Sequence, residues 1–177
     1  MDLQTATAQD VDGIARLHTD SWRRNYRGAL TDEFLDGDLL ANRRTEWAKR
    51  VAASPERRCT IVAADNSEVI GFAHTFLDEH ATWGALLDNL HVVHALKGRG
   101  IGTLLMAETA RRVLEARPSS SLYLWVLQQN TAAQEFYRAR RGVFHAPEET
   151  EPEGGGRTFR IRVTWADPAV LLVGAAG

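Results

Sequence analysis

The sequence predicts an α/β (α+β) fold, in which a mixed, mostly antiparallel sheet of about six to seven strands carries helices on both faces. Three observations support this prediction. The chain has 177 residues, a length that suits one domain. Apolar residues follow a helical period before Pro55 and a strand period after it. The later part alternates strand and helix patterns, which is typical of a strand–helix–strand crossover.

The amino-terminal third is predicted to form one short strand and then helices. Leu3 to Ala6 form the strand, and Thr7 with Asp10 resembles a capping box that opens the first helix. This helix repeats its core-facing residues at three- and four-residue steps, namely Val11, Ile14, Ala15, His18 and Trp22. A second helix is expected to begin near Thr31, and a third to run over about 42–53.

The rest of the chain is predicted to combine six strands with two helices. The strands are expected at residues 60–64, 68–77, 86–93, 122–127, 142–145 and 159–165. One helix covers 101–116, and the other covers about 131–139 with a capping box of Thr131 and Gln134. Residues 146–156 contain four glutamates and three glycines and are predicted to form a mobile acidic loop.

Composition excludes several functional classes. The 21 Lys and Arg residues and 23 Asp and Glu residues give a net charge of −2, which does not favour a general nucleic-acid binder. Cys59 is the only cysteine, so no internal disulfide or cysteine-based metal cluster can form, and no metal is expected. The start of the chain lacks a basic stretch before an apolar run, and the longest uncharged stretch, 118–134, is broken by polar residues. We therefore expect a cytoplasmic protein without membrane or nucleic-acid partners.

The segment from Leu90 to Leu104 is the most informative, because it places a basic, glycine-rich loop between a strand and a helix. Cations and glycines follow one another there as Lys97, Gly98, Arg99, Gly100 and Gly102. The first-turn amides of a helix have no partners inside it, and the helix dipole attracts anions to them. Glycine removes the Cβ atoms that would keep a bulky anion away. The segment therefore predicts a pyrophosphate-binding loop.

Two other phosphate-binding loops fit this segment less well. A Walker loop needs Lys-Ser or Lys-Thr after its last glycine, whereas Lys97 precedes the glycines here. A dinucleotide-binding loop lies early in a long parallel sheet and needs an acid about 20 residues later, where this chain has Ser120. A glycine-rich turn that merely starts a helix is the structural alternative.

Two segments resemble signatures of the GNAT superfamily of acyl-CoA-dependent N-acetyltransferases. Residues 97–102 are similar to its Arg/Gln-x-x-Gly-x-Gly/Ala loop, although Lys97 stands where Arg or Gln is usual. His94 stands where the family often has Pro. About 30 residues after the loop, the second signature is resembled by Leu124 to Asn130, Ala133, Phe136 and Tyr137.

The resemblance implies transfer of an acetyl group from acetyl-CoA to a primary amine, by direct attack in a ternary complex and without a metal. Backbone groups of the strand before the loop would pair with the pantetheine arm as an added strand does. The loop amides would hold the pyrophosphate. The residues implied for acetyl-CoA are His91, Val92, Val93, Lys97, Gly98, Arg99, Gly100, Ile101, Gly102, Thr103, Asn130, Phe136 and Tyr137.

Tyr137 is the expected catalytic acid, because the family tyrosine at this position protonates the departing CoA sulfur. A phenol with a pKa near 10 can donate to a thiolate whose acid has a pKa of about 8.5, if the environment sets that direction. The alternative is a core tyrosine packed beside Phe136. Asn130 either bonds the pantetheine amide, as the resemblance implies, or caps the following helix. The capping box predicted at Thr131 favours the ligand role.

The general base is marked less clearly by the sequence. Many relatives carry Glu early in the strand before the loop, where this chain has Leu86. Asp88 shares strand parity with Leu86 and is the expected substitute, with His91 and His74 as weaker candidates. Deprotonating an amine of pKa about 10.4 at pH 7 costs about 4.6 kcal/mol, against about 1 kcal/mol for an α-amine. The need for a base therefore depends on the acceptor.

Trp22 and Tyr26 are expected to line the acceptor mouth, because Trp22 to Gly28 resembles the acceptor-side helices of many family members. A small-molecule amine is the favoured acceptor. A protein α-amine or lysine is one alternative, and a non-catalytic acyl-CoA-binding module is another. The family also suggests a homodimer.

The resemblance spans about residues 3 to 165, so residues 1–177 are expected to form a single N-acetyltransferase domain. Within it, the acceptor-side helices would occupy about 7–53 and the acetyl-CoA-binding core about 59–145. The C-terminal strands would occupy about 142–165.

Overall fold

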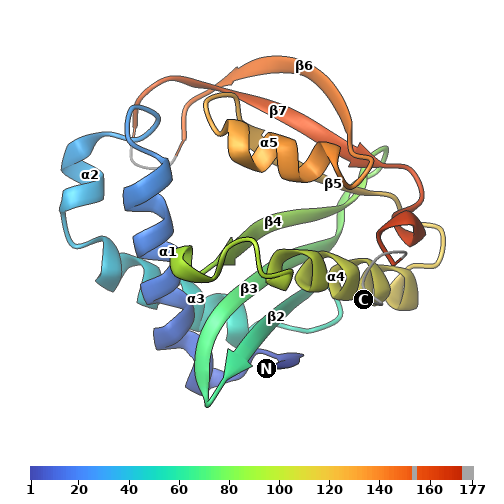
Figure 1. Ribbon diagram of the computed structural model, residues 1–177, viewed down its shortest axis with the longest axis horizontal. Coiled ribbons are helices and arrows are strands. Elements are labelled where there is room, and N and C mark those ends of the chain that lie inside the picture. The colour runs from blue at the N-terminus through green and yellow to red at the C-terminus, as the bar shows by residue number, and fades with distance from the viewer. Residues whose placement is uncertain (153–154, 173–177) are drawn as a thin grey trace.

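The computed structural model describes residues 1–152 and 155–172 of the chain (Figure 1). Its strands form one sheet in the order β1-β2-β3-β4-β5-β7-β6. Their ranges are β1 (Asp2–Thr5), β2 (Arg58–Asp65), β3 (Glu68–His80), β4 (Gly84–Val92), β5 (Leu122–Leu127), β6 (Val143–Thr150) and β7 (Thr158–Trp165). All neighbours are antiparallel except β4 and β5, which confirms the predicted mixed, mostly antiparallel sheet.

Helices cover both faces of the sheet, as predicted (Figure 1). On one face lie α1 (Val11–Asn25), α2 (Asp32–Asp36) and α3 (Leu39–Ala52), and on the other lie α4 (Ile101–Ala116) and α5 (Thr131–Arg138). Short 3-10 turns are η1 (Ala8–Asp10), η2 (His94–Leu96) and η3 (Pro168–Leu171). Strand alternation separates the two cores, since Ile61 and Ala63 pack with α4 while Val62 and Phe72 pack with α1 and α3.

The parallel strands β4 and β5 separate soon after they meet. Their register pairs Ala85 with Leu122 and Leu86 with Tyr123. Beyond these pairs β4 continues beside β3, while β5 continues beside β7. The resulting gap in the middle of the sheet positions the candidate site.

One helix boundary in the amino-terminal part differs from the sequence-based prediction. α3 begins at Leu39 rather than near Asn42, because Asp38 acts as its N-cap. The Asp38 carboxylate accepts a hydrogen bond from the Ala41 amide at 3.3 Å, which satisfies a first-turn donor. The capping box of Thr7 and Asp10 before α1 is confirmed.

The capping box predicted at Thr131 and Gln134 was wrong. Asn130 is the N-cap of α5, and its Oδ1 accepts from the Ala133 amide at 3.2 Å. The Gln134 side chain is buried and donates instead to the Gln128 carbonyl at 2.7 Å. The argument that freed Asn130 from capping therefore fails.

The predicted mobile loop over 146–156 was wrong for its first part, because β6 continues to Thr150. The β6–β7 ladder brings opposite charges side by side. Arg160 donates to Glu148 at 2.7 Å, and Arg157 donates to Glu149 at 2.8 Å. Within the remaining part of this segment, 153 and 154 lie outside the described residues.

Candidate active site

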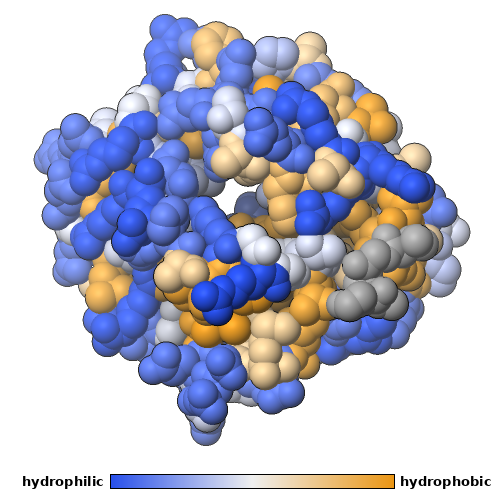
Figure 2. Space-filling view, viewed as in Figure 1, coloured by the Kyte–Doolittle hydropathy of each residue, from blue (hydrophilic) through white to orange (hydrophobic). Residues whose placement is uncertain are grey.

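A cavity of about 330 Å³ lies at the gap between β4 and β5. Its walls come from α1, β4, the loop before α4, α4 itself, β5 and α5. Figure 2 shows a hollow in the middle of one face of the molecule, with both polar and apolar residues around its rim. Residues from the amino-terminal helices, from the glycine-rich loop and from the second sequence signature therefore line one cavity.

Most of the predicted site residues line this cavity: Tyr26, Asp88, His91, Val92, Lys97, Gly98, Ile101, Gly102, Asn130, Phe136 and Tyr137. The other predicted residues do not line it: Trp22, Val93, Arg99, Gly100 and Thr103. Sequence reasoning missed Ser21 and Asn25, which also line the cavity. Their i, i+4 spacing on α1 was the available signal, because it places both side chains on one helix face.

The open edge of β4 presents fewer backbone groups than the sequence suggested. The Val93 amide donates to the Ile70 carbonyl at 2.9 Å, so this pair is hydrogen-bonded. Pairs alternate along an antiparallel ladder, and the register makes His91 with Phe72 another hydrogen-bonded pair. Val92 therefore turns its N–H and C=O toward the gap, whereas His91 and Val93 use theirs on β3. Of the three residues predicted to pair with pantetheine, Val92 is the one whose backbone groups are not used on β3, and the pairing itself stays a prediction.

The glycine-rich loop leaves the N-terminus of α4 open. Gly98 and Gly100 have φ values of +80° and +83°, a left-handed conformation that favours glycine. A Cβ atom at either position would meet nothing within 4 Å, so the loop borders open space. Gly100 is the N-cap and makes no side-chain capping bond. The first-turn amides are thus uncapped by a side chain, as an anion site requires.

Gly102 has a different structural role. A Cβ atom there would lie 3.2 Å from Cζ of Phe136, so the glycine allows α5 to approach α4 closely. The Arg140 guanidinium lies 3.5 Å from the centroid of the same Phe136 ring. It donates to the Phe136 carbonyl at 2.8 Å and also to Oγ1 of Thr103. The Thr103 hydroxyl is therefore engaged by Arg140, and the expectation for acetyl-CoA concerns the Thr103 backbone amide, which this bond does not use.

Tyr26 and Tyr137 face one cavity from opposite sides of the sheet gap. Burial raises the pKa of Tyr26 to about 12, with a smaller contribution from the negative charge of Asp88. Burial also raises the pKa of Tyr137, with a smaller contribution from Tyr26. Both phenols therefore keep their protons at neutral pH and can act as donors.

Asp88 lies on the cavity wall within an ion pair. Its Oδ2 accepts from Arg50 at 2.6 Å and from the neighbouring Asn89 amide at 2.6 Å. Arg50 itself lies over the ring of Trp47, at 5.2 Å from the centroid. The carboxylate is thus held by α3 on the cavity wall, near Tyr26.

The histidines are poorly suited to be bases. His91 lines the cavity and lies 2.7 Å from Oγ of Ser21 through its Nδ1. Burial lowers the pKa of His91 to about 3, and Lys97 contributes in the same direction. His74 is fully buried outside the cavity, 2.7 Å from the Thr60 hydroxyl, and burial lowers its pKa to about 3 as well.

Trp22 supports the site from behind instead of lining it. Its ring stacks on Tyr26 with centroids 5.5 Å apart, and the Arg43 guanidinium lies over the Trp22 ring at 4.6 Å from its centroid. It also packs with Phe34 in the small apolar cluster around α2. Trp22 is thus held in this cluster and is not among the residues that line the cavity, and its role at the acceptor mouth stays a prediction.

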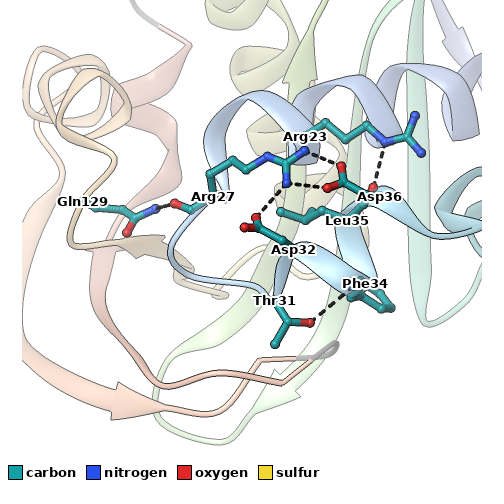
Figure 3. Close-up of polar contacts among 8 residues, drawn as sticks. All are labelled: Arg23, Arg27, Thr31, Asp32, Phe34, Leu35, Asp36 and Gln129. Atoms are coloured by element: carbon teal, nitrogen blue, oxygen red, sulfur yellow. Dashed lines mark hydrogen bonds and ion pairs between the residues drawn. The ribbon is translucent and has the colours of Figure 1, made fainter.

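The loop that follows Tyr26 is fixed to α2 and to the β5–α5 turn by polar contacts (Figure 3). Arg27 donates to Asp32 at 2.7 Å and also contacts Asp36, which ties α1 to α2. Gln129, from the turn between β5 and α5, donates to the Arg27 carbonyl at 3.0 Å. This bond links the amino-terminal helices to the segment that carries Asn130 and Tyr137.

Comparison with known proteins identifies the family of this chain. The family model described as the acetyltransferase (GNAT) family matches residues 13–143, which include both signatures and the cavity. The chain belongs to the GNAT family. This makes it an acetyl-CoA-dependent acyltransferase, and the resemblance drawn from the two signatures is confirmed.

The relatives of this GNAT acyltransferase agree with that assignment. It is 25% identical over 176 residues to the uncharacterized N-acetyltransferase YuaI of Bacillus subtilis, covering 96% of this chain and 95% of YuaI. Its fold matches PaiA N-acetyltransferase from Thermoplasma acidophilum in complex with coenzyme A, at a TM-score of 0.69 and 17% identity, over 93% and 98% of the two chains. It also matches YncA from Salmonella typhimurium with its cofactor acetyl-CoA, at 0.68 and 15%, over 93% and 92%.

The described part of the GNAT chain lacks two further features. Within residues 1–152 and 155–172, no three or more His, Cys, Asp or Glu side chains are grouped as metal ligands would be. No helix in the same ranges combines the length and apolar character needed to cross a membrane.

Proposed function

We propose that this chain transfers an acetyl group from acetyl-CoA to a primary amine of a small molecule, by direct attack of the amine in a ternary complex. One observation carries the proposal. A single cavity connects the uncapped N-terminus of α4, the open backbone edge at Val92 and the protonated Tyr137. An anion site, an edge for an extended arm and a proton donor are the groups that this transfer needs.

The residues on the α4 side suit acetyl-CoA. The amides of Ile101, Gly102 and Thr103 would bind the pyrophosphate, and Lys97 and Arg99 would add positive charge beside it. The Val92 backbone would pair with the pantetheine arm. Asn130 lines the same cavity. Its Oδ1 serves the α5 cap, so its NH₂ group is what we assign to the arm.

Tyr137 and Asp88 are assigned the two proton transfers. As the bond between the amine nitrogen and the acetyl carbon forms, the carbon–sulfur bond breaks and the thiolate takes a proton from the Tyr137 hydroxyl. The amine proton passes to the Asp88 carboxylate, directly or through water. Arg50 holds that carboxylate on the wall near Tyr26, where an incoming amine would meet it.

A small acceptor is favoured by the way the acceptor side is bridged. Gln129 ties the loop after Tyr26 to the β5–α5 turn (Figure 3). Gly156, after the β6–β7 turn, lies so close to this loop that a Cβ atom there would be 3.0 Å from the Ala29 carbonyl oxygen. These contacts leave less room for a protein α-amine or lysine on a folded polypeptide. Tyr137 in the cavity argues against a non-catalytic acyl-CoA-binding module.

Location and assembly are proposed on less direct grounds. A cytoplasmic location is supported by the single cysteine, Cys59, which is free. A homodimer is supported by the family resemblance.

The proposal is tested by thermal unfolding with acetyl-CoA, with ATP and NAD as controls, followed by thiol release with a panel of primary amines. A ligand at 100 times its dissociation constant stabilises a protein by about 2.7 kcal/mol. For a chain of this size, the midpoint should rise by roughly 5–11 °C with acetyl-CoA. An equal rise with ATP would contradict the assignment of the loop. A rise without thiol release for any amine would contradict catalysis and favour the binding module.

A further inference from the structure

The sheet face beyond the cavity carries an arginine between two tryptophans. Arg162 on β7 has its guanidinium 4.4 Å from the ring centroid of Trp125 and 4.8 Å from that of Trp83. Trp125 is the register partner of Arg162 on β5. Because cross-strand partners point to the same face of a sheet, Trp125 and Arg162 form one surface.

Arg162 has little polar compensation in the described part of the chain. Its nearest acid is Glu148, with Nη2 and Oε2 3.9 Å apart, which is too long for a hydrogen bond. Its Nε is buried without a hydrogen-bond partner, and 22% of the side chain is exposed. A guanidinium has five N–H donors in a planar fork that fits a carboxylate. Aromatic stacking thus orients this fork, and its exposed part rather than the buried Nε is what a carboxylate would meet.

The charges around Arg162 leave a positive excess. Glu148 accepts two hydrogen bonds from Arg160, at 3.0 and 2.7 Å, so its charge is shared with that neighbour. Arg160 also lies over Trp125, at 3.9 Å from the ring centroid. Arg160, Arg162 and Glu148 sum to +1, which complements a single anion, and the acids Glu79 and Asp88 lie near enough to act on the neighbouring Tyr123.

The position of this surface relates it to the acceptor end of the cavity. Trp125 lines the cavity, and so does Asp88 on the other side of the gap. Adjacent strands lie about 4.8 Å apart, so Arg162 is one strand beyond the cavity wall. An amine directed at Asp88 could therefore carry a second group that reaches Arg162.

We propose that the acceptor is a small amine that also bears a carboxylate, with the carboxylate bound by Arg162 between Trp83 and Trp125 and the amine facing Asp88. This inference rests on the proposed acetyl transfer and specifies its acceptor. The Asp88 carboxylate and the Arg162 guanidinium give the site two opposite poles. A zwitterionic amino acid is complementary to both poles, whereas a simple alkylamine meets only one.

The test compares acceptors that differ only in the distal group. Glycine, β-alanine, 4-aminobutyrate and 5-aminovalerate are each paired with their carboxamide, and kcat/KM is measured by thiol release with saturating acetyl-CoA. At the best chain length, the carboxylate should exceed its carboxamide at least tenfold in kcat/KM. Arg162→Gln should abolish this preference by lowering only the carboxylate value. Arg157→Gln is the matched control, because Arg157 lies on the same hairpin and pairs with Glu149.

Each outcome separates this inference from the proposed function. Equal kcat/KM for carboxylates and carboxamides in the unmodified enzyme would overturn the inference and leave acetyl transfer intact, and this comparison needs no variant. An equal loss on both acceptor types in Arg162→Gln would assign Arg162 a structural role. Failure of every amine, while acetyl-CoA still raises the melting temperature, would overturn the proposed function and the inference with it.

Discussion

The apolar environment of Tyr137 suits the role of proton donor that we propose for its hydroxyl. It is 8% exposed and packs against Phe136 and Trp165, with ring centroids 5.4 and 6.1 Å away. Burial in these apolar surroundings raises the pKa of the phenol, so the hydroxyl stays protonated at neutral pH and can donate a hydrogen bond. A thiolate released in the cavity would be desolvated in the same way, which raises the pKa of its thiol as well and favours protonation of the sulfur.

Tyr137→Phe should therefore lower kcat at least tenfold and leave the Kd for acetyl-CoA within about twofold of the original. Removing the hydroxyl deletes the proton donor but keeps the ring and its packing. Steady-state kinetics and calorimetric titration with acetyl-CoA would measure the two effects. An acetyl thioester of a more acidic thiol should lose less activity, because its leaving group needs less protonation. A loss that is identical for both thioesters would argue that Tyr137 only shapes the cavity.

At the scale of elements, the loop before α4 and the first turn of α4 contain three glycines for two different reasons. Gly98 and Gly100 adopt a backbone conformation that other residues reach only at a cost, and they border open space. Gly102 has no such conformation and is small because Phe136 is close. The alternating spacing alone does not distinguish these reasons.

Gly100→Ala should destabilise the fold by about 1–2 kcal/mol, the usual cost of left-handed backbone in a residue with a Cβ atom. It should also weaken acetyl-CoA binding, because the methyl group enters the space assigned to the pyrophosphate. Gly102→Ala should destabilise through the Phe136 contact, and Phe136→Leu added to it should restore part of the loss. Urea unfolding and acetyl-CoA titration would measure these effects. Rescue of Gly100→Ala by Phe136→Leu would contradict the distinction.

The sequence predicted these elements well where a local pattern determines them. The range of α4, 101–116, and that of β5, 122–127, are confirmed, since apolar periodicity and flanking breakers mark both. Caps were harder to predict, because Asn130 and Thr131 are adjacent and both suit an N-cap. β6 was predicted too short, because its glutamates are favourable in a strand only when Arg157 and Arg160 lie opposite. That information is tertiary.

The site was predictable in the same sense. The loop and Tyr137 follow from motifs, and the structure brings both to one cavity. Whether the backbone of Val92 or that of Val93 bonds to β3 depends on the β3–β4 register. The packing of the Trp22 side chain depends on α2 and α3. A one-residue change in the β3–β4 register would exchange the hydrogen-bonding of Val92 and Val93. Sequence periodicity does not specify this register.

At the scale of the whole molecule, buried histidines make stability depend on pH. His74 is fully buried, and burial lowers its pKa from 6.5 to about 3. The pKa values of His18 and His91 are lowered for the same main reason. Below pH 6.5 the unfolded chain binds protons that the folded chain does not, so the free energy of unfolding falls as the pH is lowered.

Between pH 6.5 and 5, His74 alone should account for a loss of on the order of 2 kcal/mol in the free energy of unfolding, since one pKa unit corresponds to about 1.4 kcal/mol. The loss should continue toward pH 3. Urea unfolding at several pH values would measure it. His74→Gln should show a shallower decline with falling pH than the unmodified chain. Parallel declines in the two proteins would contradict the buried, neutral state of His74.

The short seam between β4 and β5 has a mechanical consequence. The strands β1 to β4 form one half of the sheet, and β5, β7 and β6 form the other. The two halves are joined only by the two register pairs between β4 and β5 in the described residues. A pantetheine arm along Val92 would hydrogen-bond to β4 in the first half of the sheet while contacting residues of the second half. The bound cosubstrate would then bridge the two halves of the sheet. Each release of CoA would remove this bridge and allow the two halves to move relative to each other.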